Sequence, residues 1–104
     1  MTYTLSDKQL SELVLLTSVA DIVKTFPEYA PTGRTIYRRL EKYGIKKPRE
    51  ARNEFKRQLL LAAPPNVSDA DAQALIDLKV QAMLEELRAS IFSEAREHEE
   101  RFGK

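Results

Sequence analysis

The chain contains no cysteine among its 104 residues. Disulfide frameworks, cysteine zinc sites and thiol nucleophiles are therefore excluded, and the composition fits a reducing compartment. The three glycines are isolated at positions 33, 44 and 103, so the sequence has no glycine-rich loop for a phosphate group. The longest purely aliphatic run, Leu13 to Leu16, is too short for a membrane span, and the N-terminus lacks a basic signal-peptide region. We therefore expect a cytoplasmic protein that has no contact with a membrane.

Residue patterns that would indicate catalysis or metal binding are also scarce. His98 follows Glu94 by four residues, which is the spacing of a helical metal pair, but no further ligand cluster accompanies them. An exposed histidine in a charged segment is the simpler interpretation. Asp69 and Asp71 fit the electrostatics of a helix start better than they fit catalysis. We expect a protein that is not an enzyme and that holds no metal ion and no cofactor.

The charged residues are abundant and unevenly distributed. Hydrophobic residues make up 42% of the chain and charged residues 32%, which indicates one small globular domain with a highly charged surface. The net charge is only +1, but residues 1–30 carry −2, residues 31–58 carry +7 and residues 59–104 carry −4. A polyanion responds to the local field, so the basic middle of the chain says more about a partner than the total charge does.

Capping patterns, apolar spacing and prolines predict an all-α fold of four or five helices. Ser6, Ser18 and Ser68 each stand three residues before Gln9, Asp21 and Asp71, as residues that begin a helix do. The expected elements are helical residues 6–26 with a break near Thr17–Ser18, a turn at 27–32, a helix over about 33–43, a helix from Pro48 to before Pro64, and a long helix from 68 to about 102. Gly44 and Ile45 should close the third helix. The charged segment beyond Phe92 should be solvated or frayed.

The long helix is apolar on two sides. One stripe consists of Ile76, Val80, Met83, Leu87 and Ile91, and a second stripe on roughly the other side consists of Leu75, Leu78, Ala82, Ala89 and Phe92. A helix with two apolar sides is usually packed between partners. We therefore expect residues 64–104 to form a homodimer or higher oligomer, with the first stripe as the first candidate for the interface, although it could equally be the intrachain core.

The basic residues concentrate in TGRTIYRRLEKYGI, residues 32–45. At about 100° per residue, Ile36, Leu40 and Tyr43 share one side of this helix, and Arg34, Arg38 and Lys42 lie opposite with Thr35 beside them. The arginine side chain donates two parallel hydrogen bonds, which suits guanine edges and phosphates, and a helix N-terminus adds free N–H groups.

A solvated surface helix is the alternative interpretation of this segment. Two observations favour DNA binding. The basic helix follows a short helix and a turn, which is the order of a helix-turn-helix. The positive charge also continues into the next segment, at Lys46, Lys47, Arg49, Arg52 and Lys56.

The sequence SVADIVKTF…TGRTIYRRLEKYGI resembles the helix-turn-helix of bacterial regulators. The part RTIYRRLEKYGI is especially similar to the end of Fis and of the C-terminal domains of bacterial enhancer-binding proteins, in which a Thr–aliphatic–aromatic–basic–basic–Leu run ends in Tyr-Gly-Ile or a similar sequence. The resemblance covers about 28 residues. It implies that Thr35, Arg38, Arg39 and Lys42 face DNA and that Ile36 and Leu40 belong to the core.

Our leading hypothesis is therefore a helix-turn-helix protein that binds double-stranded DNA through residues 1–63, as a transcription regulator or as a phage or plasmid DNA-recognition factor. Arg34, Thr35, Arg38 and Lys42 would meet the major groove, and phosphates would be held by Arg39, Lys46, Lys47, Arg49, Arg52 and Lys56. Two other hypotheses stay open: a helical adaptor or inhibitor whose basic face docks on an acidic protein, and RNA binding through residues 34–57.

Overall fold

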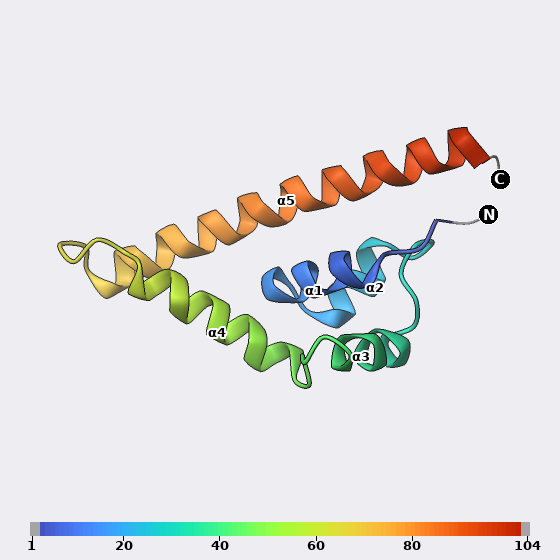
Figure 1. Ribbon diagram of the computed structural model, residues 1–104. Helices are drawn as coiled ribbons and strands as arrows, with labels where there is room; N and C mark the ends of the chain where they lie inside the picture. Colours follow the sequence, from blue (N-terminus) through green and yellow to red (C-terminus); the bar gives the residue numbers. More distant parts are fainter. Residues whose placement is uncertain (1–2, 103–104) are drawn as a thin grey trace.

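The computed structural model describes residues 3–102, which form five helices and no strand. The helices are α1 (Asp7–Leu16), α2 (Val19–Thr25), α3 (Gly33–Glu41), α4 (Pro48–Leu61) and α5 (Asp69–Phe102) (Figure 1). The predicted all-α class is confirmed, and the number of helices lies within the predicted range. The molecule is elongated, with extents of 53 × 27 × 19 Å. None of the helices within residues 3–102 is long and apolar enough to cross a membrane.

Local hydrogen bonds begin the helices where the sequence predicts them. The Ser6 hydroxyl accepts from the Gln9 N–H at 3.1 Å, and the Gln9 side chain accepts from the Ser6 N–H at 2.9 Å, which completes a capping box. Ser18 caps α2 by accepting from the Asp21 N–H at 3.1 Å. The predicted break near Thr17–Ser18 is confirmed, because Thr17 leaves the helical conformation and Ser18 begins a new helix.

The connection between α2 and α3 covers seven residues, 26–32, and is held by backbone hydrogen bonds. The N–H of Ala30 donates to the Phe26 carbonyl at 2.8 Å, and the N–H of Leu5 donates to the Tyr29 carbonyl at 3.0 Å. Thr32 then caps α3 by accepting from the Thr35 N–H at 3.3 Å. The bond from Leu5 connects the loop to the segment before α1, so this seven-residue connection has a defined structure.

The end of α3 differs slightly from the prediction. The helix ends at Glu41, and the next residues form a turn in which Gly44 has a φ of 78°. The Ile45 N–H donates to the Leu40 carbonyl at 3.1 Å, and the Ile45 side chain packs against the hydrophobic core, so Gly44 and Ile45 close the helix as predicted. Because the helix ends two residues early, Tyr43 leaves the inner face to which the spacing assigned it, and 56% of its surface is exposed.

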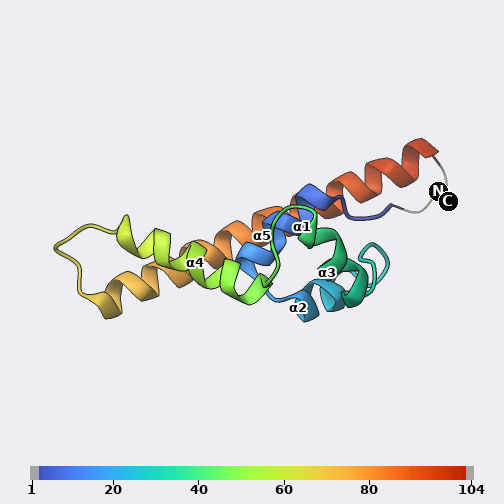
Figure 2. The same cartoon turned by 60° about the horizontal axis from the view of Figure 1, so that its bottom comes forward.

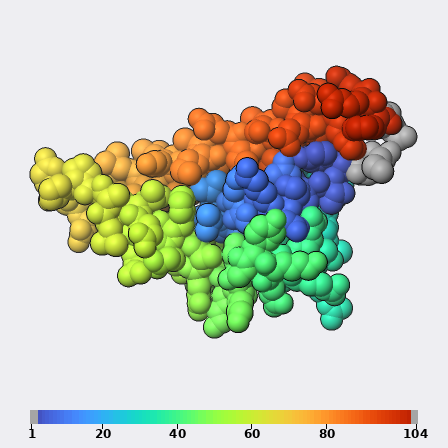
Figure 3. Space-filling view, in the orientation of Figure 1, coloured from blue at the N-terminus to red at the C-terminus, as the bar shows by residue number. Residues whose placement is uncertain are grey.

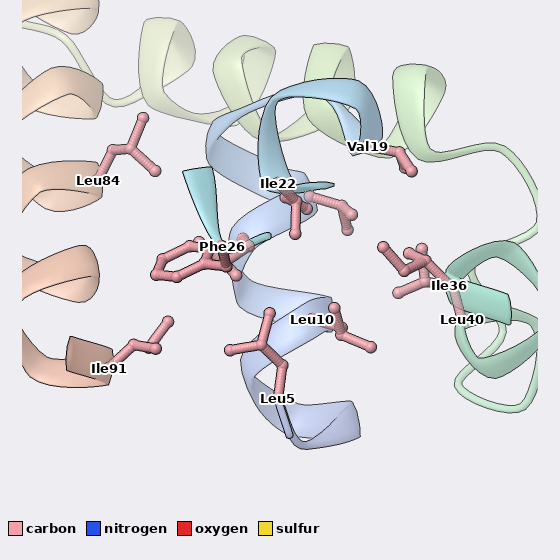
Figure 4. Packing of buried hydrophobic residues seen from close by; sticks show 11 residues of the cluster. Leu5, Leu10, Val19, Ile22, Phe26, Ile36, Leu40, Leu84 and Ile91 are labelled. Atoms are coloured by element: carbon pink, nitrogen blue, oxygen red, sulfur yellow. The ribbon is translucent and has the colours of Figure 1, made fainter. Parts of the chain in front are cut away.

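The core joins the three N-terminal helices to the second half of α5. Figure 4 shows Leu84 and Ile91 of α5 on one side and Ile36 and Leu40 of α3 on the other, with residues of α1 and α2 between them. The Arg88 guanidinium of α5 also donates to the Asp21 carboxylate of α2 at 2.9 Å. The long helix therefore belongs to the same hydrophobic core as α1, α2 and α3.

The first apolar stripe of α5 faces the inside of this chain. Ile76, Val80 and Ile91 are buried, as is Leu84, which the prediction left out. Met83 was predicted on this stripe, but it lies at the edge of the packed face and is 36% exposed. Most of the stripe first considered for oligomerisation is thus used by the intrachain core.

The part of α5 beyond Phe92 is mostly exposed to solvent, as predicted, but the prediction that it could be frayed is wrong. The helix continues to Phe102, and Ala95 is completely buried. Glu94 accepts hydrogen bonds from the Tyr3 hydroxyl at 3.0 Å and from the Gln9 amide at 2.9 Å. Residues at the other end of the described chain therefore hold this part of α5 in place.

The helices α4 and α5 form a V that opens around the other three. Both views show the loop between α4 and α5 projecting beyond α1, α2 and α3 (Figures 1 and 2). Pro48 is the only residue of α4 that is buried. The tip of the V thus has fewer neighbours within the chain than the rest of the molecule does.

Candidate nucleic-acid interface

The helix α3 is held by its apolar side and presents its basic side to solvent. Ile36 and Leu40 are 0% and 1% exposed, while Arg34, Arg38 and Lys42 are exposed on the opposite side. In Figure 3, α3 and the start of α4 form the lower edge of the molecule, on the side away from α5. This division agrees with the faces calculated from the helical period.

Thr35 lies at the edge of the basic face near the start of α3. Its side chain is half-buried, and its hydroxyl accepts a hydrogen bond from the Thr32 hydroxyl at 3.1 Å. The first turn of α3 contains no acidic residue. The free N–H groups of this turn and the neighbouring arginine therefore favour an anion at this end of the helix.

Arg39 has a different role from its neighbour Arg38. Its Nε donates to the Asp7 carboxylate, and its second terminal nitrogen donates to the Leu5 carbonyl at 3.1 Å. The Arg39 side chain is 26% exposed, and Leu5 is completely buried. Arg39 therefore attaches α3 to the start of α1, whereas the sequence assigned it to a phosphate.

Arg39→Ala is expected to lower the free energy of unfolding by about 1–2 kcal/mol, because it removes a charged hydrogen bond and leaves the Leu5 carbonyl without its partner. Urea unfolding followed by circular dichroism measures this loss. Arg38→Ala is the matched control, and it should change stability by no more than about 0.5 kcal/mol, because Arg38 is exposed. Equal stabilities of the two variants would contradict the structural role of Arg39.

The loop after α3 and the first turn of α4 extend the basic surface. Lys46, Lys47 and Arg49 are exposed there. Lys47 lies 3.6 Å from the Glu50 carboxylate, but both side chains are more than 70% exposed, so solvent weakens this pair. These three cations follow α3 along the chain and extend the basic surface that Arg34, Arg38 and Lys42 begin.

The remaining cations of α4 are less available. Arg52 is half-buried, and the Lys56 ammonium lies 3.8 Å from the Asp77 carboxylate of α5. Arg57 donates two hydrogen bonds of 2.9 Å to Glu54, and this contact lowers the pKa of the Glu54 carboxyl. Among residues 3–102, the basic residues of 31–58 that form no ion pair are Arg34, Arg38, Lys42, Lys46, Arg49 and Arg52.

Two further residues of α3, Glu41 and Tyr37, are exposed. Glu41 lies three residues after Arg38 on the outer face, and its carboxylate would repel a phosphate placed there. Tyr37 is 50% exposed at the edge of the same face. The exposure of Tyr37 depends on where α3 packs on α1 and α2, which the spacing of the sequence does not determine.

The histidine and glutamate at helical spacing are part of the packing at the C-terminal end of α5. The His98 ring lies 5.6 Å from the Tyr3 ring and 4.8 Å from the Phe102 ring. Glu94 is occupied by the hydrogen bonds from Tyr3 and Gln9 described above. Burial raises the pKa of the Tyr3 hydroxyl, and the hydrogen bond to Glu94 raises it further. The prediction that His98 is exposed is therefore wrong: its ring is half-buried in aromatic packing, and its Nε2 atom is buried without a hydrogen-bond partner among the described residues.

Comparisons of the chain with protein-family models, with curated proteins and with solved structures found no match. The function is therefore argued below from the surface of the molecule.

Proposed function

We propose that this protein is a small cytoplasmic DNA-binding protein in which α2 and α3 act as a helix-turn-helix and α3 enters the major groove. The observation that carries the proposal is the exposed basic face of α3, on which Arg34, Arg38 and Lys42 form no ion pair within the described residues. The role would be that of a transcription regulator or a phage or plasmid DNA-recognition factor. The protein would act as a homo-oligomer and would perform no chemistry of its own.

The contacts divide naturally into base contacts and phosphate contacts. Arg38 projects from the middle of the face opposite Ile36 and Leu40, so it can reach a base edge while the core keeps its packing. Lys46, Lys47 and Arg49 follow in the loop and at the start of α4, where they suit the DNA backbone. Arg39 and Lys56 have intramolecular partners, so the proposed interface depends less on them.

Titration against duplex DNA, an RNA hairpin and heparin at two salt concentrations tests the proposal. DNA binding should be tighter for a selected duplex than for a random duplex, and both affinities should fall as salt rises. Equal binding to all three polyanions would indicate charge attraction alone. Absence of binding to any of them would favour the interpretation of the basic face as a docking surface for an acidic protein.

RNA binding through residues 34–57 is the second candidate, and a specific observation supports it. Tyr37 and Tyr43 are 50% and 56% exposed, and both lie next to the basic residues of α3. Exposed aromatic rings can stack on the unpaired bases of RNA loops. A preference for the hairpin, lost in Tyr37→Ala, would favour this candidate over duplex DNA.

Lys47→Ala is expected to weaken binding to selected and random duplexes about equally, since the side chain is 73% exposed in a loop and suits a phosphate. Loss of one phosphate contact should lower the slope of log affinity against log salt by about one. Fluorescence anisotropy over a salt series measures both quantities. A loss restricted to the selected duplex would show instead that Lys47 contacts a base.

A further inference from the structure

The outer side of α5 carries apolar residues that are largely exposed, and Leu75 among them also lines the hollow between α4 and α5. Leu75 and Leu78 are 58% and 68% exposed, and Ala82 is also exposed. Their spacing of three and four residues places them on one face of the helix. Ile76, Val80 and Leu84 are buried on the other side of α5, so the other apolar side of this helix packs within the chain itself.

The part of α5 that carries this face belongs to the projecting tip of the V. Figures 1 and 2 show the beginning of α5 and the end of α4 extending past the three N-terminal helices. Leu61, the last residue of α4, is 72% exposed in the same region. Exposed leucines that share one helix face, as Leu75 and Leu78 do, are typical of an association surface on a small domain.

The charges beside this face are complementary to those of a second copy. Lys79 and Glu86 are exposed, are seven residues apart and therefore flank the face on the same side. Neither forms an ion pair within the described residues. In an antiparallel pair of helices that cross near Ala82, Lys79 of each copy meets Glu86 of the other, because the two residues lie at similar distances on opposite sides of the crossing point. A two-fold axis makes the two contacts equivalent.

A parallel pair lacks this complementarity. It would place Lys79 and Glu86 beside Ala74 and Gln81 of the second copy, which carry no charge. The small side chain of Ala82 at the crossing point would also let the two helix axes come close together. Both features favour the antiparallel order.

We infer that two copies of the protein associate through the outer face of α5, formed by Leu75, Leu78 and Ala82, in an antiparallel arrangement with two Lys79–Glu86 ion pairs between the copies. The inference deepens the proposed homo-oligomer by naming its surface and orientation. It does not depend on DNA binding, because the association is measured with the protein alone.

Analytical ultracentrifugation of the full chain at micromolar concentrations tests the surface. The wild-type protein should sediment with the mass of two copies, and Leu78→Asp should sediment as one copy. Leu78 is 68% exposed, so the circular dichroism spectrum and the melting temperature of this variant should stay those of a folded helical protein. Glu100→Lys, an exposed charge reversal in the last turns of α5, is the control and should leave the dimer intact.

Charge reversal tests the orientation. Lys79→Glu and Glu86→Lys should each raise the dissociation constant of the dimer by about tenfold, because each replaces two attractive pairs with two repulsive ones. The double variant should return the constant to near its wild-type value. A monomeric wild-type protein, or a dimer unaffected by Leu78→Asp, would overturn the proposed surface. A dimer that Leu78→Asp abolishes but the double variant does not restore would overturn the antiparallel order.

Discussion

Arg38→Ala is expected to lower the affinity for a selected DNA duplex by about 5- to 150-fold, which corresponds to roughly 1–3 kcal/mol for one bidentate base contact. The affinity for random duplex should change much less, because that binding depends on the total charge of the surface. Arg38 lies on the exposed side of α3, opposite the completely buried Ile36, so its removal leaves the packing of the helix unchanged. Fluorescence anisotropy with both duplexes over a salt series measures the difference.

The control for Arg38 is Arg96→Ala, which removes an exposed arginine from α5, a helix outside the proposed DNA interface. This variant should bind both duplexes with affinities close to those of the wild-type protein. Thermal melts of the two variants should coincide within the error expected for surface substitutions. If Arg38→Ala stays folded and binds both duplexes like the wild-type protein, α3 does not read DNA, and the adaptor hypothesis becomes the leading one.

Phe26→Ala is expected to lower the free energy of unfolding by about 3–5 kcal/mol, which is a large share of the stability of a small domain. Phe26 is the largest completely enclosed side chain of the core, with 1% of its surface exposed, and its ring lies 5.0 Å from the ring of Phe92. Truncation would leave a cavity between α2 and α5 that the rigid helices cannot close. Thermal unfolding should shift downward by at least about 10 °C.

A matched control for Phe26 is Phe102→Ala, which removes the same side chain where 60% of its surface is exposed. Its cost should be about 1 kcal/mol or less, because little apolar area is lost from the protein interior. Circular dichroism melts of both variants provide the comparison. A melting temperature for Phe26→Ala within a few degrees of the wild-type value would mean that α5 does not share the core with α2.

The sequence by itself determined the local features of the fold. Ser6, Ser18 and Thr32 begin helices because their hydroxyls accept from N–H groups three residues later, and such contacts need no distant partner. Gly44 ends α3 for an equally local reason, since its φ of 78° strains other residues. The buried and exposed sides of α3 also followed from the helical period, because one apolar side was enough to define them.

Only the tertiary structure could separate Arg38 from Arg39. The two arginines are neighbours on one short helix, and the resemblance to known DNA-binding helices assigned both to DNA. Arg39 instead bonds to Asp7 and to the Leu5 carbonyl, which are 32 and 34 residues away in the sequence. Which residue pairs with Arg39 depends on how α3 packs on α1, and the sequence pattern within α3 does not predict that packing.

The long helix α5 shows the same limit on a larger scale. Its sequence has two apolar stripes of similar strength, and periodicity alone cannot say which one a chain buries for itself. The packing of Leu84 and Ile91 against the N-terminal helices decided that question and left Leu75 and Leu78 exposed. Packing also placed the charged end of α5 against Tyr3 and Gln9, where hydrogen bonds to Glu94 hold it. Short-range propensity determined that α5 is a helix, whereas contacts between residues far apart in the sequence determined which of its sides is available to a partner.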